Sequence, residues 1–416
     1  MKNVYASIDI GSVAIKIVVC ELYNNKLNLL ATSSVKSRGI KKGLIINAEE
    51  AKETIMEALN DIEKMLGIKI RKIIASIPAN NATFTLIKGE SEITSDSRIV
   101  TSCDVVNTLQ DAISKKQSKL LEVVTVIPID FKLDERIHIT NPLKQKGKKL
   151  EAKAILVEAP KKNIKSVLTV LKSCGLEVVD IVINSIGVMS ALSNDDTKSK
   201  IGSIINIGAE TTNVSIYNKG VLISNSILNV GGSLIDDFIS STYKISKDQA
   251  IRLKTRFIVS NPKYASSNEF MEVETTDLKK LKINQLEISK QVSKKYLEIL
   301  ELSIKDLNNN ASKNLDYIMF TGGVTNAFHF DTLIKDKLGK IASVAKVKIV
   351  GLRNNQNSSS VGNIIFYINK MKLKGQITSM ISSEDHEDLS SVKKNTANIS
   401  SDSMLNNVVS YFFGEW

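Results

Sequence analysis

SIDIGSVAIKIVVCEL, the stretch from Ser7 to Leu22, contains an apolar run that reaches Asp9, passes through Gly11 and Ser12, and resumes at once. This pattern predicts two strands joined by a tight turn. A glycine lets the backbone approach a ligand closely, and successive backbone N–H groups in such a turn attract anions. Asp9 could hold a metal ion or a water, and Lys16 could reach back to a phosphate. An ordinary hairpin with a polar tip is the alternative, because short glycine motifs often match by chance.

The same pattern of strand, glycine turn and strand is predicted about 200 residues later. There, INIGAETTNVSI (205–216) has the same kinds of residue in the same order as IDIGSVAIKIVV (8–19). Both begin with an acidic or amide residue, one apolar residue and a glycine, and continue through a turn of small residues. A third glycine turn ends the predicted strand in NLDYIMFTGGVTN (314–326). We interpret the first two as an internal repeat of hairpins that could close on one phosphate chain from opposite sides.

Length and composition predict a soluble globular protein of several subdomains, with 416 residues, 43% hydrophobic and 24% charged. No apolar run reaches the roughly 20 residues of a membrane-spanning helix, and no signal peptide is expected. The three cysteines have no metal-ligand spacing, and the three histidines argue against a histidine metal cluster.

The net charge of +12 raises the question of nucleic-acid binding. The excess is lysine spread along the chain, arginine is scarce, and no basic run has interleaved aromatic residues for base stacking. We therefore interpret the charge as solvated faces and expect no nucleic-acid partner. A weak attraction to an anionic membrane stays open.

Hydrophobic spacing predicts alternating strands and helices along the whole chain. The expected strands lie within 4–35, 72–78, 83–89, 123–133, 151–160, 178–183, 201–232 and 314–321, and the expected helices are 48–66, 102–116, 162–174, 234–256, 278–309 and 358–371. Between about 80 and 160, short alternating strands surround one helix, which indicates an inserted α+β unit. From about 373 to 402 the composition is polar and charged, which is typical of a disordered linker.

Three glycine turns in the order DxG, NxGxxT and TGG, on a duplicated sheet, resemble the actin/hexokinase-like ATPase superfamily. Further stretches narrow the match. SRGIKKGLIIN (37–47), VIPIDFKLD (126–134), NPLKQKGKKLEAKAILV (141–157) and SCGLEVVDIVINSIGVMSAL (173–192) are similar to the FtsA family of bacterial cell-division proteins. The resemblance covers residues 1–372 in order and extends to the linker and terminal segment.

The resemblance implies a duplicated α/β fold of two RNase H-like halves with an inserted α+β subdomain, 1C, which is SHS2-like. It also implies the subdomain boundaries. The first half would consist of subdomain 1A at 1–80, 161–200 and the final helix 358–372, with 1C at 81–160; the second half would consist of 2A at 201–234 and 313–357, with 2B at 235–312. A linker at 373–402 and an amphipathic helix at 403–416 would follow.

The family's activity implies that the chain binds ATP or ADP with Mg²⁺ and polymerises on the inner face of the cell membrane at the division site. It would tether FtsZ there by docking the FtsZ C-terminal tail on subdomain 2B, and would meet other division proteins through 1C. Candidate basic residues for the tail are Arg252, Lys254, Arg256, Lys294 and Lys295, whose alternative is a solvated helix face. Alternative functions are a PilM-like scaffold of a membrane assembly, or a kinase of the same superfamily.

By position in the family's motifs, the resemblance implies a set of nucleotide-binding residues. They are Asp9, Gly11, Ser12, Val13, Lys16, Asn206, Gly208, Ala209, Glu210, Thr211, Thr212, Gly231, Gly232, Arg252, Lys254, Gly322, Gly323 and Val324. Asp9 is also the candidate metal ligand.

Four positions depart from the family's pattern. Asn206 replaces an aspartate that faces the metal, and Asn184 replaces a glutamate that would prepare the attacking water. Neither amide supplies a charge for Mg²⁺ or a general base. Glu210 replaces a loop glycine, and Ile251 replaces a glutamate that would hold the ribose. No catalytic residue is therefore assigned, and we expect at most a weak ATPase; normal binding through backbone amides and Lys16 is the alternative.

The last residues, SDSMLNNVVSYFFGEW, place their apolar side chains on one helical stripe. The stripe consists of Met404, Leu405, Val408, Val409, Phe412, Phe413 and Trp416. A helix of this length is about 21 Å long, too short to span a bilayer of about 30 Å, so it would lie in the interface. Its polar face has no lysine or arginine, so binding would depend on apolar burial. Packing on the protein itself or on a partner groove is the alternative.

Overall fold

The computed structural model describes residues 3–115, 120–311, 314–347, 349, 352, 355–375, 379–382 and 385. Two five-stranded sheets, in the orders β11-β6-β1-β2-β3 and β14-β13-β12-β17-β18, repeat one topology. In each, an antiparallel meander of three strands is extended by two parallel strands. The first sheet comprises β1 (Asn3–Ile10), β2 (Ala14–Tyr23), β3 (Lys26–Lys36), β6 (Lys72–Ile77) and β11 (Glu177–Ile183). The second comprises β12 (Ile201–Ile207), β13 (Thr212–Asn218), β14 (Val221–Leu228), β17 (Tyr317–Thr321) and β18 (Ala342–Val344).

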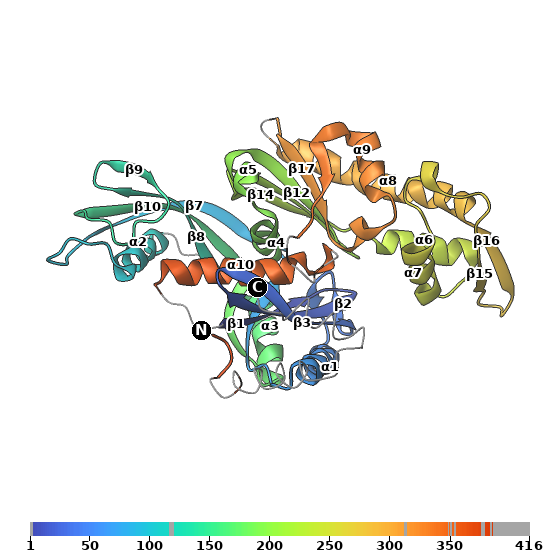
Figure 1. Ribbon diagram of the computed structural model, residues 1–416, viewed down its shortest axis with the longest axis horizontal. Coiled ribbons are helices and arrows are strands. Elements are labelled where there is room, and N and C mark those ends of the chain that lie inside the picture. The colour runs from blue at the N-terminus through green and yellow to red at the C-terminus, as the bar shows by residue number, and fades with distance from the viewer. Residues whose placement is uncertain are drawn as a thin grey trace, which may run out of the picture.

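The first sheet is covered by helices on both faces (Figure 1). These helices are α1 (Ala48–Leu66), α3 (Lys161–Ser173), α4 (Asn184–Leu192) and α10 (Ser358–Leu373), and the short α5 (Asp195–Ser199) leads into the second sheet. Helix α1 begins because the Asn47 side chain accepts from two backbone N–H groups, and it ends at Gly67 in the left-handed conformation. A small hairpin, β4 (Ile40–Lys41) and β5 (Leu44–Ile45), precedes it.

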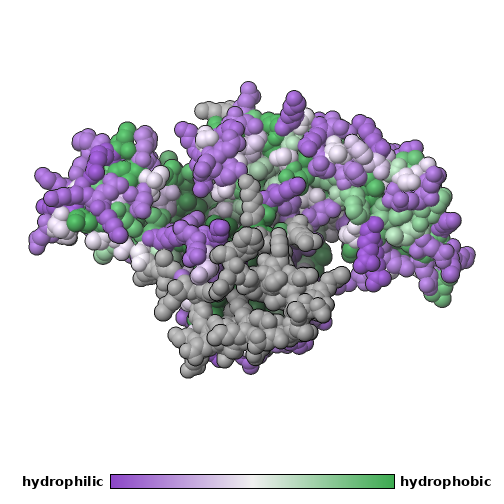
Figure 2. Space-filling model, viewed as in Figure 1, coloured by the Kyte–Doolittle hydropathy of each residue, from purple (hydrophilic) through white to green (hydrophobic). Residues whose placement is uncertain are grey.

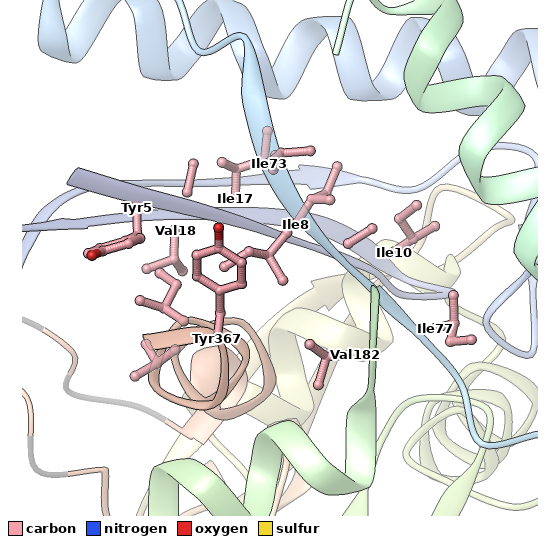
Figure 3. Close-up of a cluster of buried hydrophobic side chains, with 14 of the residues drawn as sticks. Tyr5, Ile8, Ile10, Ile17, Val18, Ile73, Ile77, Val182 and Tyr367 are labelled. Atoms are coloured by element: carbon pink, nitrogen blue, oxygen red, sulfur yellow. The ribbon is translucent and has the colours of Figure 1, made fainter. Parts of the chain in front are cut away.

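The core of the first half is a layer of isoleucine and valine side chains between sheet and helices (Figure 3). Tyr367 of α10 meets Tyr5 of β1 edge to face, with ring centroids 6.1 Å apart. Helix α10 crosses α4 closely because both have a glycine at the crossing. A Cβ added at Gly362 would lie 1.7 Å from the carbonyl oxygen of Gly187. The chain's last described helix therefore closes the first half, far in sequence from its first strand.

The inserted unit has its own four-stranded sheet, in the order β7-β10-β8-β9, with one helix against it. Its elements are β7 (Thr83–Glu92), α2 (Ser102–Ser114), β8 (Leu121–Leu133), β9 (Arg136–Ile139) and β10 (Lys149–Pro160). It forms an arm at one side of the molecule (Figure 1). A separate buried cluster, which includes Ile93, Val105, Phe131 and Leu150, holds it together. The expected α+β unit is thus present, inserted between β6 and α3.

Two expected helices in the second half were wrong in part. The helix expected at 234–256 is two helices, α6 (Ser233–Tyr243) and α7 (Lys247–Arg256). Lys244 ends α6 in the left-handed conformation, and Ser246 and Gln249 form a capping box that starts α7. The Ser-x-x-Gln pattern was the signal for this break.

The helix expected at 278–309 begins only at Gln285, as α8 (Gln285–Asn310), because Asn284 caps it. Residues before it form a hairpin of β15 (Phe270–Glu274) and β16 (Lys280–Asn284). In β16, Leu281 and Ile283 alternate with lysines, a period of two that the helical interpretation missed. With α9 (Phe330–Leu338), which packs against β18, these elements complete the second half.

The linker expected from 373 was also wrong at its start. Leu373 belongs to α10, and residues 379–381 lie against β1. The Met380 N–H donates to the Val4 carbonyl at 2.9 Å, and Ser379 Oγ accepts from the Val4 N–H. Strand β6 pairs with β1 only at Ser7 and Ile8, so this segment covers part of β1 that β6 does not reach. The rest of the expected linker and the expected helix at 403–416 lie outside the described residues, apart from Lys374, Gly375, Ser382 and Asp385.

Hydrophilic side chains alternate with smaller hydrophobic areas on the visible face of the inserted unit and of the second half (Figure 2). Among the described residues, no helix is long and apolar enough to cross a membrane.

Candidate functional site

A cavity of about 640 Å³ lies between the two halves. Its walls are the β1–β2 turn, the β4–β5 turn, the β12–β13 turn and the loop after β17, with the first residues of α4, α6 and α10 and one side of α7. Three helices thus begin at this cavity, at Asn184, Ser233 and Ser358. Helix N-termini carry a partial positive charge, so the walls favour an anion.

The β1–β2 turn places a charged pair at the cavity. Asp9 and Lys16 stand opposite each other in the strand register, with 3.6 Å between Oδ2 and Nζ. Ser76 Oγ donates to the other Asp9 oxygen at 3.0 Å, and Lys16 Nζ donates to the Gln356 carbonyl at 3.0 Å. The Gly11 N–H donates to the Ala14 carbonyl at 3.2 Å, which closes the turn. The Lys16 side chain is therefore anchored in β2 and extends to the loop before α10 on another wall of the cavity.

The β12–β13 turn is built in the same way but without that charged pair. The Gly208 N–H donates to the Thr211 carbonyl at 2.9 Å, and the carbonyls of Gly208 and Ala209 accept from the N–H groups of Gly232 and Ser233. Asn206 stands opposite Asn213 in the register. Asn213 Nδ2 donates to Ser185 Oγ at 2.8 Å, within a neutral side-chain network.

The loop after β17 presses against this turn. Gly322 has φ +94, and a Cβ there would lie 2.3 Å from the Ile207 carbonyl oxygen. Only glycine fits this position without a backbone shift. At Gly323 the nearest atom to an added Cβ is Gln356 Cγ, 3.9 Å away. Close packing therefore explains why residue 322 is a glycine. At Gly323 there is free space, so this side of the cavity is open.

A nearly buried ion pair forms the inner wall. Lys254 Nζ lies 2.6 Å from Asp236 Oδ1 and donates to the Gly232 carbonyl at 3.3 Å. The two side chains are 14% and 7% exposed. Burial raises the pKa of the Asp236 carboxyl, and the Lys254 ammonium opposes that rise. The pair fixes the lysine at the cavity beside Gly232, where α6 begins.

Glu210, the unexpected carboxylate in the second turn, lines the cavity and is held by a backbone group of the first half. Its Oε2 accepts from the Lys42 N–H at 2.6 Å, in the β4–β5 turn of the first half. The next N–H, of Gly43, donates to Ser12 Oγ at 2.8 Å in the first turn. The β4–β5 turn thus bridges the two glycine turns.

The cavity brings together all the expected nucleotide-binding residues except three. Thr212 is buried and donates its hydroxyl to the Val230 carbonyl. Gly231 packs behind the second turn, where a Cβ would lie 2.6 Å from the carbonyl oxygens of Gly208 and Ala209. Arg252 is exposed, because α7 turns Ile251 and Lys254 to the cavity and Arg252 away from it.

Several lining residues were not assigned from the sequence. They include Lys42, Gly43, Pro78, Ala79, Asn80, Asn213, Asp236, Thr255, Tyr296, Asn355, Gln356, Ser358 and Ser359. Lys42 and Gly43 lie in the GIKKG motif, which identified the family but gave no contact. Asn355 to Ser359 had no turn glycine to mark them.

The positions that depart from the family all lie at this cavity. Asn184, Asn206 and Ile251 line it together with Glu210. Asn184 Oδ1 accepts from Ser359 Oγ at 3.4 Å. Within the part of the chain that the structure describes, no three His, Cys, Asp or Glu side chains are grouped to hold a metal ion.

Comparison with known proteins gives two family models. One described as cell division protein FtsA matches residues 203–362, and one described as type IV pilus assembly protein PilM matches residues 7–261. The chain is 28% identical over 378 residues to cell division protein FtsA of Bacillus subtilis (strain 168), which covers 90% of this chain and 86% of that protein. FtsA of Streptococcus pneumoniae serotype 2 is 26% identical, over 84% of this chain and 77% of the relative.

Solved structures agree on the fold. A chain of a PilM–PilN type IV pilus biogenesis complex has a TM-score of 0.56 at 14% identity, and covers 87% of this chain and 98% of that chain. MreB 5 of Spiroplasma citri bound to AMPPNP has a TM-score of 0.56 at 16% identity, over 90% of this chain and 99% of that chain. The fold is actin-like.

Proposed function

The chain belongs to the actin-like family that the PilM model describes, and its curated relatives place it among the FtsA cell-division proteins; on that premise we propose that it is a nucleotide-dependent adaptor. It would polymerise on the inner face of the membrane at the division site and hold FtsZ there. Its likeness to FtsA relatives over most of its length is the observation on which this proposal rests.

ATP or ADP is the proposed ligand of the cavity. Its phosphates would lie between the first and second glycine turns, near Lys16 and the N-termini of α6 and α10. The nucleoside would lie toward Lys254 and Gly323, where the wall is open. The volume of about 640 Å³ suits a ligand of this size. A nucleotide-bound relative of the same fold, MreB 5 with AMPPNP, supports the assignment.

Mg²⁺ would enter with the phosphates rather than occupy a protein cage. Mg²⁺ keeps several waters and commonly uses one or two carboxylates. Asp9 fits the role of orienting those waters, since it is fixed by Ser76 and Lys16. When bound, the ion would neutralise phosphate charge.

Hydrolysis is proposed to be weak. A water that attacks a phosphate needs a group to accept its proton, and Asn184 and Asn206 are amides. Nucleotide occupancy would therefore control assembly more than turnover does.

Membrane attachment is proposed for residues 403–416, through the stripe that ends at Trp416. Each anchor gains apolar burial but loses the conformational entropy of the segment, so a single anchor is marginal. Many anchors on one polymer would give durable attachment.

The FtsZ tail is proposed to dock on the unit formed by α6, α7, the β15–β16 hairpin and α8. Arg252, Arg256 and Lys294 are exposed there. Lys295 is half-buried and pairs with Glu298, and Lys254 is committed to Asp236. The three exposed residues are therefore the candidates to test. Contacts with other division proteins are proposed for the arm formed by β7, α2, β8, β9 and β10.

A PilM-like scaffold is the second candidate, because the PilM model matches residues 7–261. Such a scaffold would prefer a short peptide from a pilus protein to an FtsZ tail.

The test is co-sedimentation with lipid vesicles and the protein's own FtsZ, with and without ATP, using the full chain and a chain that ends at Asp402. The proposal expects only the full chain to pellet and to carry FtsZ with it. Pelleting of the full chain without FtsZ favours the scaffold, and two soluble chains contradict the membrane assignment.

A further inference from the structure

The β4–β5 turn directs two consecutive backbone N–H groups at the two glycine turns. Lys42 has φ +50 and Gly43 has φ +73, the conformation of a tight two-residue hairpin turn. The Lys42 N–H meets Glu210 Oε2 at 2.6 Å, and the Gly43 N–H meets Ser12 Oγ at 2.8 Å. Ser12, Lys42, Gly43 and Glu210 all line the cavity. The two halves are therefore joined where the glycine turns come together.

The Glu210 carboxylate holds a position suited to a phosphate oxygen. Backbone N–H groups in a tight turn bind anions, and a carboxylate oxygen accepts from them as a phosphate oxygen does. Here the anion that the Lys42 N–H binds is the Glu210 carboxylate, from the β12–β13 turn of the same chain. An incoming phosphate group at this point would have to displace Glu210 or lie beside its negative charge.

We propose that Glu210 closes the place of a third phosphate, so that the cavity takes a nucleoside diphosphate in preference to a triphosphate. This inference rests on the proposed function, which puts the nucleoside near Lys254 and the phosphates toward the glycine turns. Two phosphates would reach Lys16 and the start of α6. A third would reach the junction between Ser12, Lys42 and Glu210.

Charge sets the size of the preference. Two like charges about 4 Å apart repel strongly even near a protein surface, so at least about a tenfold loss of triphosphate affinity is expected. The alternative for the protein is to break the Glu210–Lys42 hydrogen bond, which opens the join between the two halves. Either route disfavours the triphosphate and leaves the diphosphate unaffected.

The experiment is titration calorimetry of ADP and of ATP into the full chain, in EDTA and in Mg²⁺. The variants are Glu210→Gln, which keeps the shape and removes the charge, and Glu210→Gly, which removes the side chain. Asp237→Asn is the matched control. Asp237 pairs with Lys247 on the surface at 2.8 Å and lies outside the cavity lining.

The inference expects wild type to bind ADP at least about tenfold more tightly than ATP. Both Glu210 variants should raise ATP affinity by about that factor and change ADP affinity less than about twofold, and the control should keep the wild-type ratio. The thermal transition of Glu210→Gln should show that it remains folded.

Equal wild-type affinities for the two nucleotides contradict the inference and leave the proposed function standing. So does a loss of ATP affinity in Glu210→Gln that occurs only with Mg²⁺, because the carboxylate would then be a metal ligand. If neither nucleotide binds to any variant, the proposed nucleotide site is wrong and the inference with it.

Discussion

The two glycine turns share one backbone design and differ in their side-chain chemistry. Asp9 and Lys16 stand at the register position that Asn206 and Asn213 occupy in the second turn. Gly11 and Gly208 close their turns with equivalent hydrogen bonds, to Ala14 and Thr211. At this register position the first turn therefore offers a carboxylate and an ammonium, whereas the second turn offers two amides and carries its one carboxylate at Glu210, nearer the tip. A duplicated fold can keep its geometry while one copy loses its charges.

The loops after the parallel strands differ in a similar way. Strand β6 leads into Pro78, Ala79 and Asn80, and β17 leads into Gly322 and Gly323, and all five line the cavity. The second loop packs so tightly on its neighbour that Gly322 has no room for a Cβ. The second half thus depends on a close backbone approach at this loop.

The largest effect should come from Gly322→Ala. The substitution puts a Cβ against the Ile207 carbonyl at a left-handed φ, and we expect a loss of about 4 kcal/mol in the free energy of unfolding. Gly323→Ala is the matched control and should cost less than about 1 kcal/mol, because its surroundings are open. Urea unfolding of both variants measures the difference. Equal losses would mean that the second half does not rely on this close approach.

Lys254→Met should come next. It leaves the Asp236 carboxylate buried without its cation, at a cost of about 3 kcal/mol. The pKa of Asp236 is already raised by burial, so the folded state holds this proton more tightly than the unfolded state. Stability from that proton is fully present below the unfolded pKa and is lost as pH rises from there through the folded pKa. Without Lys254 the pKa rises further, so the variant should lose more stability relative to wild type at pH 7 than at pH 5.

Unfolding curves at both pH values check this, and Asp236→Asn combined with Lys254→Met should recover part of the loss. A pH-independent deficit in Lys254→Met would contradict the role given to the Asp236 charge.

Placing carboxylates at the two amide positions of the cavity, Asn184 in the first half and Asn206 in the second, should increase hydrolysis. Asn184→Glu with Asn206→Asp should raise ATP turnover by about tenfold or more, because a positioned general base contributes at least that much. Phosphate release measured with and without Mg²⁺ tests this. Asn225→Asp, at an amide outside the cavity lining, is the control. Unchanged turnover in the double variant would mean that the amides do not limit hydrolysis.

The smallest effect should come from the exposed ion pair between the halves. Lys36 and Asp248 are 2.9 Å apart, but both side chains are largely exposed. Lys36→Met should change the free energy of unfolding by less than about 0.5 kcal/mol. A larger loss would show that surface pairs, rather than the β4–β5 turn, join the two halves.

Much of the fold could be predicted because strand periodicity and glycine turns are local signals. Both hairpins, the inserted unit and the final helix have the expected places. Two helix boundaries were missed because capping by Ser246 and Asn284 competes with a helical apolar pattern. The contact between Met380 and Val4 joins residues far apart in sequence, and no local pattern indicates it.

The site was predictable where a glycine marked it and unpredictable where a distant backbone group completed it. Gly11, Gly208 and Gly322 were found from their motifs. The hydrogen bond from Lys42 to Glu210 links residues 168 positions apart and depends on how the halves meet. Arg252 was misplaced because the rotation of α7 decides which residues reach the cavity, and motif position does not give that rotation.

The most direct test of the nucleotide site is calorimetric titration of ADP into wild type, Lys16→Met and Lys36→Met. Both lysines lie in the first sheet, but only Lys16 lines the cavity. We expect saturable binding of one ADP per chain, weakened at least about tenfold by Lys16→Met and unchanged by Lys36→Met. Two results would contradict a nucleotide site in which the first glycine turn binds the phosphates. One is ADP binding that Lys16→Met leaves unchanged, and the other is no saturable binding to wild type.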